Sequence, residues 1–144
     1  MAEPYPIHDL CIRAVEPKPG SGETRWAALA ESDPLLRRFA LAEVIRLEPQ
    51  LTPTLRLRPV ADEVWVLIEG VVLFAWLDLR TDSPTHGVRH MFEARQPVQV
   101  LAPFGVAFGT QALEGTALLV RLASHADNDP EAQEDRLLAW ETGS

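Results

Sequence analysis

Proline and glycine interrupt the chain at short intervals, and this spacing most constrains what the chain can fold into. Its 144 residues include 12 prolines and 8 glycines. The apolar segments between them are mostly short and rich in Val, Leu, Ile, Phe and Trp. Short apolar segments bounded by turn-forming residues are typical of β-strands. The sequence therefore predicts an all-β domain.

The clearest predicted strands are residues 63–69 and 71–78. Gly70 lies between them and can adopt the positive φ of a tight turn, so the pair is predicted to form a β-hairpin. Further strands are predicted at residues 38–47, 53–58, 98–102, 105–111 and 116–122. Strands at this spacing are typical of a sandwich or a barrel.

Residues 64–68 are apolar without alternation. A strand of this kind is covered on both faces, for example by a second sheet and by a partner subunit. The sequence therefore favours a homodimer.

Composition limits the class of protein. An apolar share of 47% with 24% charged residues is typical of one globular domain. The formal net charge of -8, without a Lys/Arg cluster, argues against nucleic acid as a partner. The sequence contains no run of about 18 uncharged apolar residues, so no membrane-spanning helix is predicted. The single Cys11 and the lack of a leader-like start predict a cytoplasmic protein, with Cys11 as a buried small side chain.

Three segments lie outside the predicted strands. Residues 17–23 are predicted to form a loop between two weak N-terminal strands. Residues 33–38 are predicted to begin a helical turn, with Asp33 as its cap. Residues 127–144 begin with an acidic run and are predicted to form a short helix or arm that docks Trp140 against the barrel.

Two spacings resemble the motifs of the cupin superfamily. Arg56-Leu57-Arg58, Glu63 and Gly70 have the spacing of the first motif, in which two histidines precede a glutamate and a glycine. Pro103-Phe104-Gly105 and Phe108 have the spacing of the second motif, in which a Pro-x-Gly turn precedes a histidine. The resemblance implies a double-stranded β-helix, the jelly-roll barrel of cupins.

A third segment narrows the resemblance. Residues 77–87 closely resemble the Asp-Leu-Arg-x-x-Ser-Pro-Thr-x-Gly segment of the dTDP-4-dehydrorhamnose 3,5-epimerases and dTDP-sugar ketoisomerases. Asp129-Pro130 and Trp140 look like the terminal arm of that family, with Asn128 where a tyrosine would stand. The resemblance implies one domain, 1–144, with a barrel core at 38–123 and an arm at 124–144, and a homodimer formed by strand exchange or sheet extension.

The metal ligands of the family are replaced here. Cupins that bind a metal use two histidines, the glutamate and the later histidine. In this chain Arg56 and Arg58 (or Leu57 and Pro59, if the spacing is one residue shorter) and Phe108 replace the histidines. Guanidinium stays protonated and does not ligate metals, so we expect no metal and no cofactor.

The acid/base residues are also replaced. The resemblance to the epimerases implies general acid/base catalysis. In those enzymes a histidine, oriented by an aspartate, removes a proton next to a keto group, and a tyrosine protonates the opposite face. Residues 54–59 contain no histidine, and the one tyrosine is Tyr5. The remaining candidates for acid/base residues are His125 with Asp127, and His86.

Arg56 and Arg58 alternate with leucines and are predicted to share one face of a strand. If that face lines the barrel, with Glu63 close enough to pair, they would hold an anion. If it faces water, they are surface charges. Trp65, Trp76 and Phe74 are predicted to be core residues.

Three hypotheses about function follow from these patterns. The first is a metal-free cupin-like protein, non-catalytic or divergent, that binds a small molecule such as a sugar nucleotide or another anion, or acts in assembly. Its predicted ligand-binding residues are Arg56, Arg58, Glu63 and Phe108. The alternative is an active dTDP-4-keto-6-deoxy-sugar 3,5-epimerase or ketoisomerase with relocated acid/base residues. A third reading is a sensor of an acidic metabolite. Asp78 and Arg80 are predicted to form a structural salt bridge or turn anchor.

Overall fold

The computed structural model describes residues 7–29, 36, 38–49, 53–126, 129–130 and 136–140. Most of the predicted helical turn at residues 33–38 lies outside these ranges, as do Tyr5, Asp127 and Asn128. Within the described part of the chain, no helix is long and apolar enough to cross a membrane.

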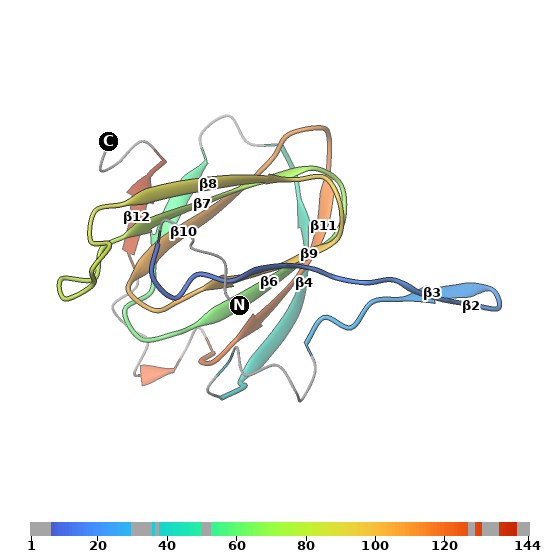
Figure 1. Cartoon of the computed structure of the whole chain (residues 1–144), viewed down its shortest axis with the longest axis horizontal. Coiled ribbons are helices and arrows are strands. Elements are labelled where there is room, and N and C mark those ends of the chain that lie inside the picture. The colour runs from blue at the N-terminus through green and yellow to red at the C-terminus, as the bar shows by residue number, and fades with distance from the viewer. Residues whose placement is uncertain are drawn as a thin grey trace.

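Two five-stranded antiparallel sheets form the body of the molecule, which confirms the all-β prediction (Figure 1). The first sheet has the order β1 (Ile12–Ala14), β9 (Val98–Ala102), β6 (Glu63–Glu69), β11 (Ala117–Ala123), β4 (Leu41–Leu47). The second sheet has the order β12 (Arg136–Ala139), β5 (Thr54–Leu57), β10 (Val106–Ala112), β7 (Val72–Asp78), β8 (Arg89–Ala94).

The main core lies between the two sheets. Phe74, Trp76 and Phe108 from the second sheet form an aromatic cluster, with ring centroids 5.4–6.2 Å apart. Leu67 and Leu119 pack against the same core from the first sheet. Phe74 and Trp76 are fully buried, so their predicted core role is confirmed.

Strand β6 is covered on both faces, as its unbroken apolar run predicts. One face contributes Leu67 to the core between the sheets, and Val64 and Val66 pack in a second cluster on the other face. The chain itself supplies part of that second cover, since Ala28 and Leu29 pack there. The Gln99 side chain fixes this segment by donating to the Ala28 carbonyl at 2.6 Å. A partner subunit is therefore not needed to explain the apolar run, and the homodimer stays a prediction.

The predicted hairpin of residues 63–69 and 71–78 is wrong. Strand β6 pairs with β9 and β11, whereas β7 pairs with β8 and β10 in the other sheet. Gly70, with φ of 103°, is the corner at which the chain leaves one sheet for the other. A Cβ atom there would lie 2.8 Å from the Ala117 backbone, so this corner requires glycine.

The C-terminal segment was predicted to form a short helix or an arm, and its described residues 136–139 form a strand instead of a helix. Strand β12 pairs with β5 along the edge of the second sheet. Trp140, directly after β12, packs against the outer cluster that contains Leu55 and Leu57. The predicted docking of Trp140 is therefore confirmed, while its element is an edge strand.

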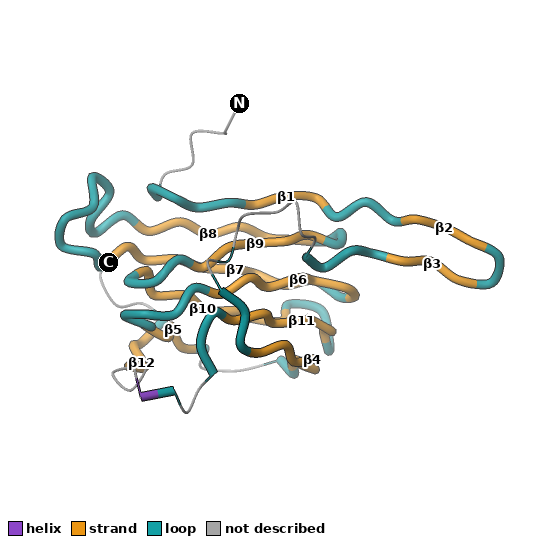
Figure 2. The backbone as a smooth tube through the Cα atoms, turned by 90° about the horizontal axis from the view of Figure 1, so that it is seen from below, coloured by secondary structure: helices purple, strands orange, loops and turns teal. Residues whose placement is uncertain are grey.

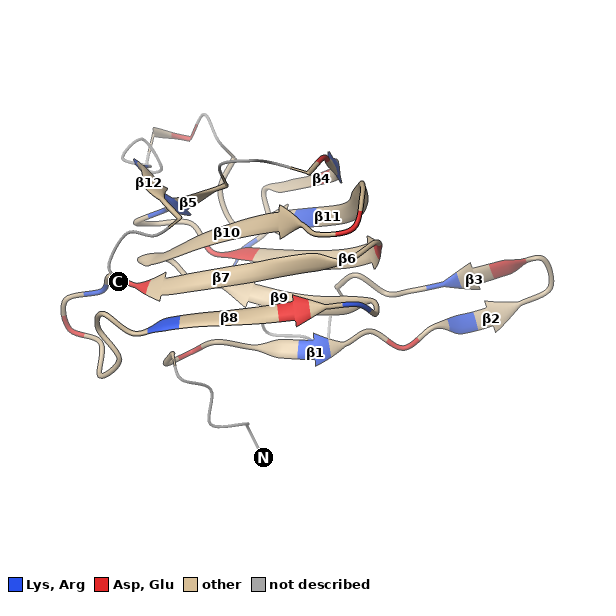
Figure 3. Cartoon of the chain, turned by 90° about the horizontal axis from the view of Figure 1, so that it is seen from above, with Lys and Arg blue, Asp and Glu red and all other residues tan. Residues whose placement is uncertain are grey.

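The predicted loop at residues 17–23 contains most of a β-hairpin. Strands β2 (Lys18–Gly20) and β3 (Glu23–Arg25) pair only with each other, and all six of their residues are exposed. The hairpin projects well beyond the body (Figure 2). Figure 3 shows acidic and basic residues next to each other on it.

The segment between β7 and β8 is organised around the carboxylate of Asp78. This fully buried carboxylate accepts hydrogen bonds from Arg80 Nε at 3.0 Å, Ser83 Oγ at 2.6 Å and Thr85 Oγ1 at 2.7 Å. The predicted salt bridge between Asp78 and Arg80 is confirmed. Burial acts to raise the pKa of Asp78, but the hydrogen bonds from Arg80, Ser83 and Thr85 outweigh it and hold this pKa well below its usual range.

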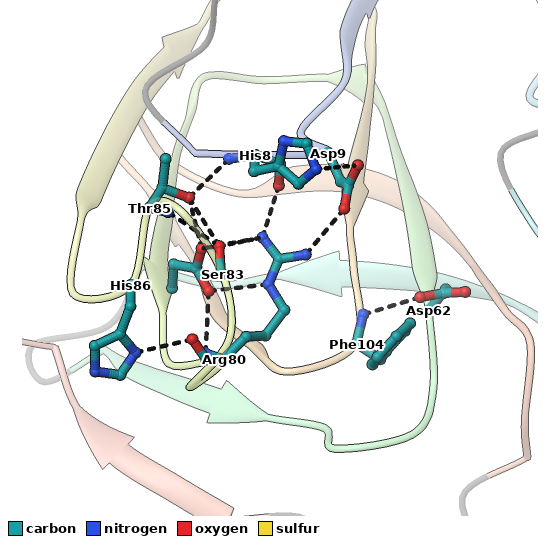
Figure 4. A network of polar contacts seen from close by, with 9 residues as sticks. His8, Asp9, Asp62, Arg80, Ser83, Thr85, His86 and Phe104 are labelled. Carbon is teal, nitrogen blue, oxygen red and sulfur yellow. Dashed lines mark hydrogen bonds and ion pairs between the residues drawn. The ribbon is translucent and has the colours of Figure 1, made fainter.

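Arg80 connects the same network to the N-terminal segment (Figure 4). Its guanidinium donates to the His8 carbonyl at 2.7 Å and to Asp9 Oδ2 at 3.1 Å. Thr85 Oγ1 accepts a hydrogen bond from the His8 backbone N–H at 2.9 Å. The serine and threonine of this segment therefore have structural roles in this chain.

Asp78→Asn is expected to lower the free energy of unfolding at neutral pH by about 3 kcal/mol, because it removes the buried charge that pairs with Arg80 and accepts hydrogen bonds from Ser83 and Thr85. A lowered pKa stabilises the fold above the ordinary carboxyl pKa of about 3.9, and this contribution is lost as the pH falls below it. Urea unfolding across pH should therefore show the wild type and Asp78→Asn converging in acid. The exposed Asp82→Asn is the control, and a constant difference between wild type and Asp78→Asn at all pH values would contradict the assignment.

Candidate functional site

A cavity of about 340 Å³ opens between the two sheets at one end of the core. The first sheet contributes side chains from β4, β6 and β11, and the second contributes side chains from β5, β10 and β12. All four predicted ligand-binding residues line this cavity: Arg56, Arg58, Glu63 and Phe108. The structure therefore brings these four residues together, while their role in binding stays a prediction.

The alternation of β5 explains how the arginines reach the cavity. Leu55 and Leu57 are buried in the outer cluster, so Arg56 and Arg58 project to the opposite face, toward the cavity. Of the two alternatives for this face, the structure selects the barrel interior. Arg56 is exposed, whereas Arg58 is only 4% exposed. Arg56 therefore lies at the mouth of the cavity and Arg58 at its floor.

Glu63 is the centre of a buried ion cluster at the floor. Its Oε2 atom lies 2.6 Å from Arg58 Nε, 2.7 Å from Arg121 Nε and 2.5 Å from Arg121 Nη2. Its Oε1 atom accepts a hydrogen bond from the Trp65 indole N–H at 3.0 Å. Both oxygens of the carboxylate are therefore engaged by donors of the protein.

Arg121 extends this cluster toward the rim. Its Nη1 atom lies 2.7 Å from Glu43 Oε1 on the neighbouring strand. The strand register explains the contact, because Arg121 pairs with Glu43 on one side and with Trp65 on the other. The side chain of Glu43 is 40% exposed, against 6% for Glu63, so the ion pairs run from a dry floor to a wet rim.

Aromatic side chains form another wall of the cavity. The rings of Trp65 and Phe108 lie with their centroids 5.5 Å apart. Phe108 also packs on the core, where its register partner is Trp76. The cavity therefore combines an apolar wall with a floor of paired charged side chains. Apolar walls with a few polar groups are typical of small-molecule sites.

Sequence reasoning missed Arg121 and Glu43. In β11, Arg121 has the same parity as the buried Ala117 and Leu119, so it points into the barrel. A charged residue at an inward position of an apolar strand is the signal that identifies it. Glu43 shows no such signal, because only the pairing of β4 with β11 places it beside Arg121.

The predicted acid/base candidates lie elsewhere. His125 is 3% exposed, and its Nδ1 atom lies 2.8 Å from Ser124 Oγ. His86 is exposed, and its Nδ1 atom lies 2.9 Å from the Arg80 carbonyl. Asp127 lies outside the described residues. Among the side chains described at the cavity, none is a histidine, tyrosine, lysine or cysteine.

The floor does not fit the divalent metal that some cupins bind. Among Arg56, Arg58, Glu63 and Phe108, only Glu63 is a metal-ligand type, and the protein already engages both of its oxygens. Within the described ranges, no three His, Cys, Asp or Glu side chains gather as a metal site.

Comparison by sequence finds a curated relative at low identity. No protein-family model matches the chain. The spore coat polysaccharide biosynthesis protein SpsL of Bacillus subtilis (strain 168) is 25% identical over 119 residues, which cover 81% of this chain and 79% of SpsL.

Solved structures identify the fold. A dTDP sugar isomerase from Desulfovibrio desulfuricans G20 matches with a TM-score of 0.79 and 16% identity, over 94% of this chain and 87% of that one. The dTDP-4-dehydrorhamnose 3,5-epimerase of Elizabethkingia anophelis NUHP1 matches with a TM-score of 0.74 and 19% identity, over 91% and 75% of the two chains.

The chain therefore has the cupin jelly-roll fold, as the resemblance of its motifs implied. Within that class, it has the fold of the dTDP-sugar 3,5-epimerases and isomerases.

Neutralising Glu63 and neutralising Glu43 are expected to have very different effects. Glu63→Gln should lower the free energy of unfolding by about 3 kcal/mol, because it breaks a buried ion cluster. Glu43→Gln should cost less than about 1 kcal/mol, because this carboxylate is partly solvated. Urea unfolding measures both values, provided that the dependence of the free energy of unfolding on urea concentration is the same in the variants and the wild type. Equal losses for the two variants would contradict the description of a dry floor and a wet rim.

Proposed function

We propose that this protein binds a sugar nucleotide, or a phosphorylated sugar of similar shape, in the cavity between its sheets, without converting it. One observation carries the proposal: an open cavity lined by three arginines and two aromatic rings on an epimerase fold. Arginine suits phosphate because its planar fork donates two parallel hydrogen bonds. The exposed Arg56 at the mouth is the residue proposed to hold the phosphate.

The size of the cavity supports a small-molecule ligand. Its volume of about 340 Å³ lies at the lower end of the range for ligand pockets. A sugar ring fits into it, while a nucleotide attached to that sugar would extend past the mouth. Trp65 and Phe108 offer the apolar surface on which such a ring packs.

The carboxylates at the cavity support binding rather than proton transfer. Proton removal next to a keto group needs a base with an oxygen or nitrogen free to reach the substrate. Both oxygens of Glu63 accept hydrogen bonds from the protein, and Oε1 of Glu43 accepts one from Arg121 at the partly solvated rim. The alternative of an active epimerase or ketoisomerase needs another base, and His125 and His86 are not among the residues at the cavity.

The test combines binding with solvent exchange. Incubation with dTDP-4-keto-6-deoxyglucose in deuterated water should raise the melting temperature but leave the sugar without deuterium above the spontaneous rate. Deuterium entering the sugar would contradict the proposal and favour the enzyme. An unchanged melting temperature would contradict binding.

A matched pair of variants locates the phosphate contact. Arg56→Met should weaken the binding of dTDP-4-keto-6-deoxyglucose roughly tenfold, because a hydrogen bond to a charged group is lost. Arg46→Met removes the same charge from β4 at an exposed position outside the cavity, and should bind as the wild type does. Equal affinities for the two variants, measured by calorimetry, would contradict the role of Arg56.

A further inference from the structure

Two arginines at the floor of the cavity converge on a single oxygen atom. Arg58 approaches Glu63 Oε2 from the end of β5, and Arg121 approaches it from β11 with two nitrogens, all at 2.5–2.7 Å. Arg58, Glu63 and Arg121 are each at least 95% buried. Two guanidinium groups converging in a dry pocket are the arrangement with which proteins bind a carboxylate or a phosphate. Here the chain supplies the anion itself.

We propose that the floor is an anion-binding site filled from within by Glu63, and that Glu63 thereby determines which ligands the cavity accepts. The inference deepens the proposed function and rests on it for the identity of the ligand. A free carboxylate or phosphate must displace Glu63 to reach the two arginines. The cavity therefore excludes small free anions from its floor.

The charge balance defines the inner end of the ligand. Arg58 and Arg121 carry two positive charges, which Glu63 at the floor and Glu43 at the rim balance, and Arg56 adds a third positive charge at the mouth. A second carboxylate pushed toward the floor would meet the charge of Glu63 in a poorly solvated space, where like charges are costly. An uncharged hydroxyl meets no such repulsion. The inner end of the ligand is therefore a neutral, hydroxylated ring, with the phosphates at the mouth.

Chemical rescue tests the anion site without any nucleotide. Glu63→Ala vacates the space of the carboxylate, so formate should raise its melting temperature saturably, while chloride at the same ionic strength should not. Glu63→Gln keeps that space filled and is the matched control. Formate should stabilise neither Glu63→Gln nor the wild type in this way. A saturable rise in the wild type, or an equal response of Glu63→Ala to formate and chloride, would overturn the assignment.

If Glu63→Ala does not fold in chloride, refolding of this variant in formate and in chloride is compared. The yield of folded protein, measured by the fluorescence of the tryptophans, should then rise with formate concentration and stay near zero in chloride. No folded protein in formate would overturn the assignment.

A pair of sugar nucleotides tests the specificity. dTDP-glucose and dTDP-glucuronate differ by one carboxylate on the sugar. The wild type should bind dTDP-glucose at least about tenfold more tightly, and Glu63→Gln should lose most of that preference, because like-charge repulsion is removed. A preference unchanged by Glu63→Gln would overturn the role of Glu63 in specificity. If neither nucleotide binds the wild type, the proposed function fails, and the formate experiment still decides the anion site.

Discussion

The contact on which the site depends is the buried carboxylate of Glu63 between Arg58 and Arg121. Arg58 follows a strand of the second sheet, whereas Glu63 and Arg121 belong to the first sheet, so the cluster joins the two layers at the floor of the cavity. Burying three charges is costly, and such a cluster is tolerated only when every member is paired. The same pairing that satisfies the fold also engages both oxygens of the Glu63 carboxylate.

Much of the fold could be predicted from local patterns, because proline, glycine and apolar runs mark where strands begin and end. The expected segments at 63–69 and 98–102 coincide with β6 and β9. What failed was the pairing of strands. Gly70 permits a tight turn in either case, and only contacts distant in sequence decide that β6 joins β11 while β7 joins β10. The same limit applies to β12, whose few apolar residues form a strand because β5 offers a free edge.

Site residues could be predicted where the alternation of side chains along one strand places them. They could not be predicted where the pairing between strands places them. Alternation placed Arg56 and Arg58 on one face, and motif spacing added Glu63 and Phe108, which lie at the same cavity. Arg121 has a readable inward parity, but its distance from Glu63 follows from strand pairing over 58 residues of sequence. His86 and His125 were predicted as acid/base candidates because imidazole titrates near neutral pH. Their positions depend on the loop and strand end that carry them, beside Arg80 and Ser124.

The central claim is that Glu63 remains paired with Arg58 and Arg121 while a ligand binds in the outer part of the cavity. Nuclear magnetic resonance of the arginine Nε–Hε groups during titration with dTDP-glucose tests it most directly. The account predicts that the resonance of Arg56 shifts on binding, while Arg58 and Arg121 keep the shifts and slow hydrogen exchange of a buried ion pair. Large shifts of Arg58 and Arg121, with loss of their protection from exchange, would show that the ligand displaces Glu63 and would contradict the account.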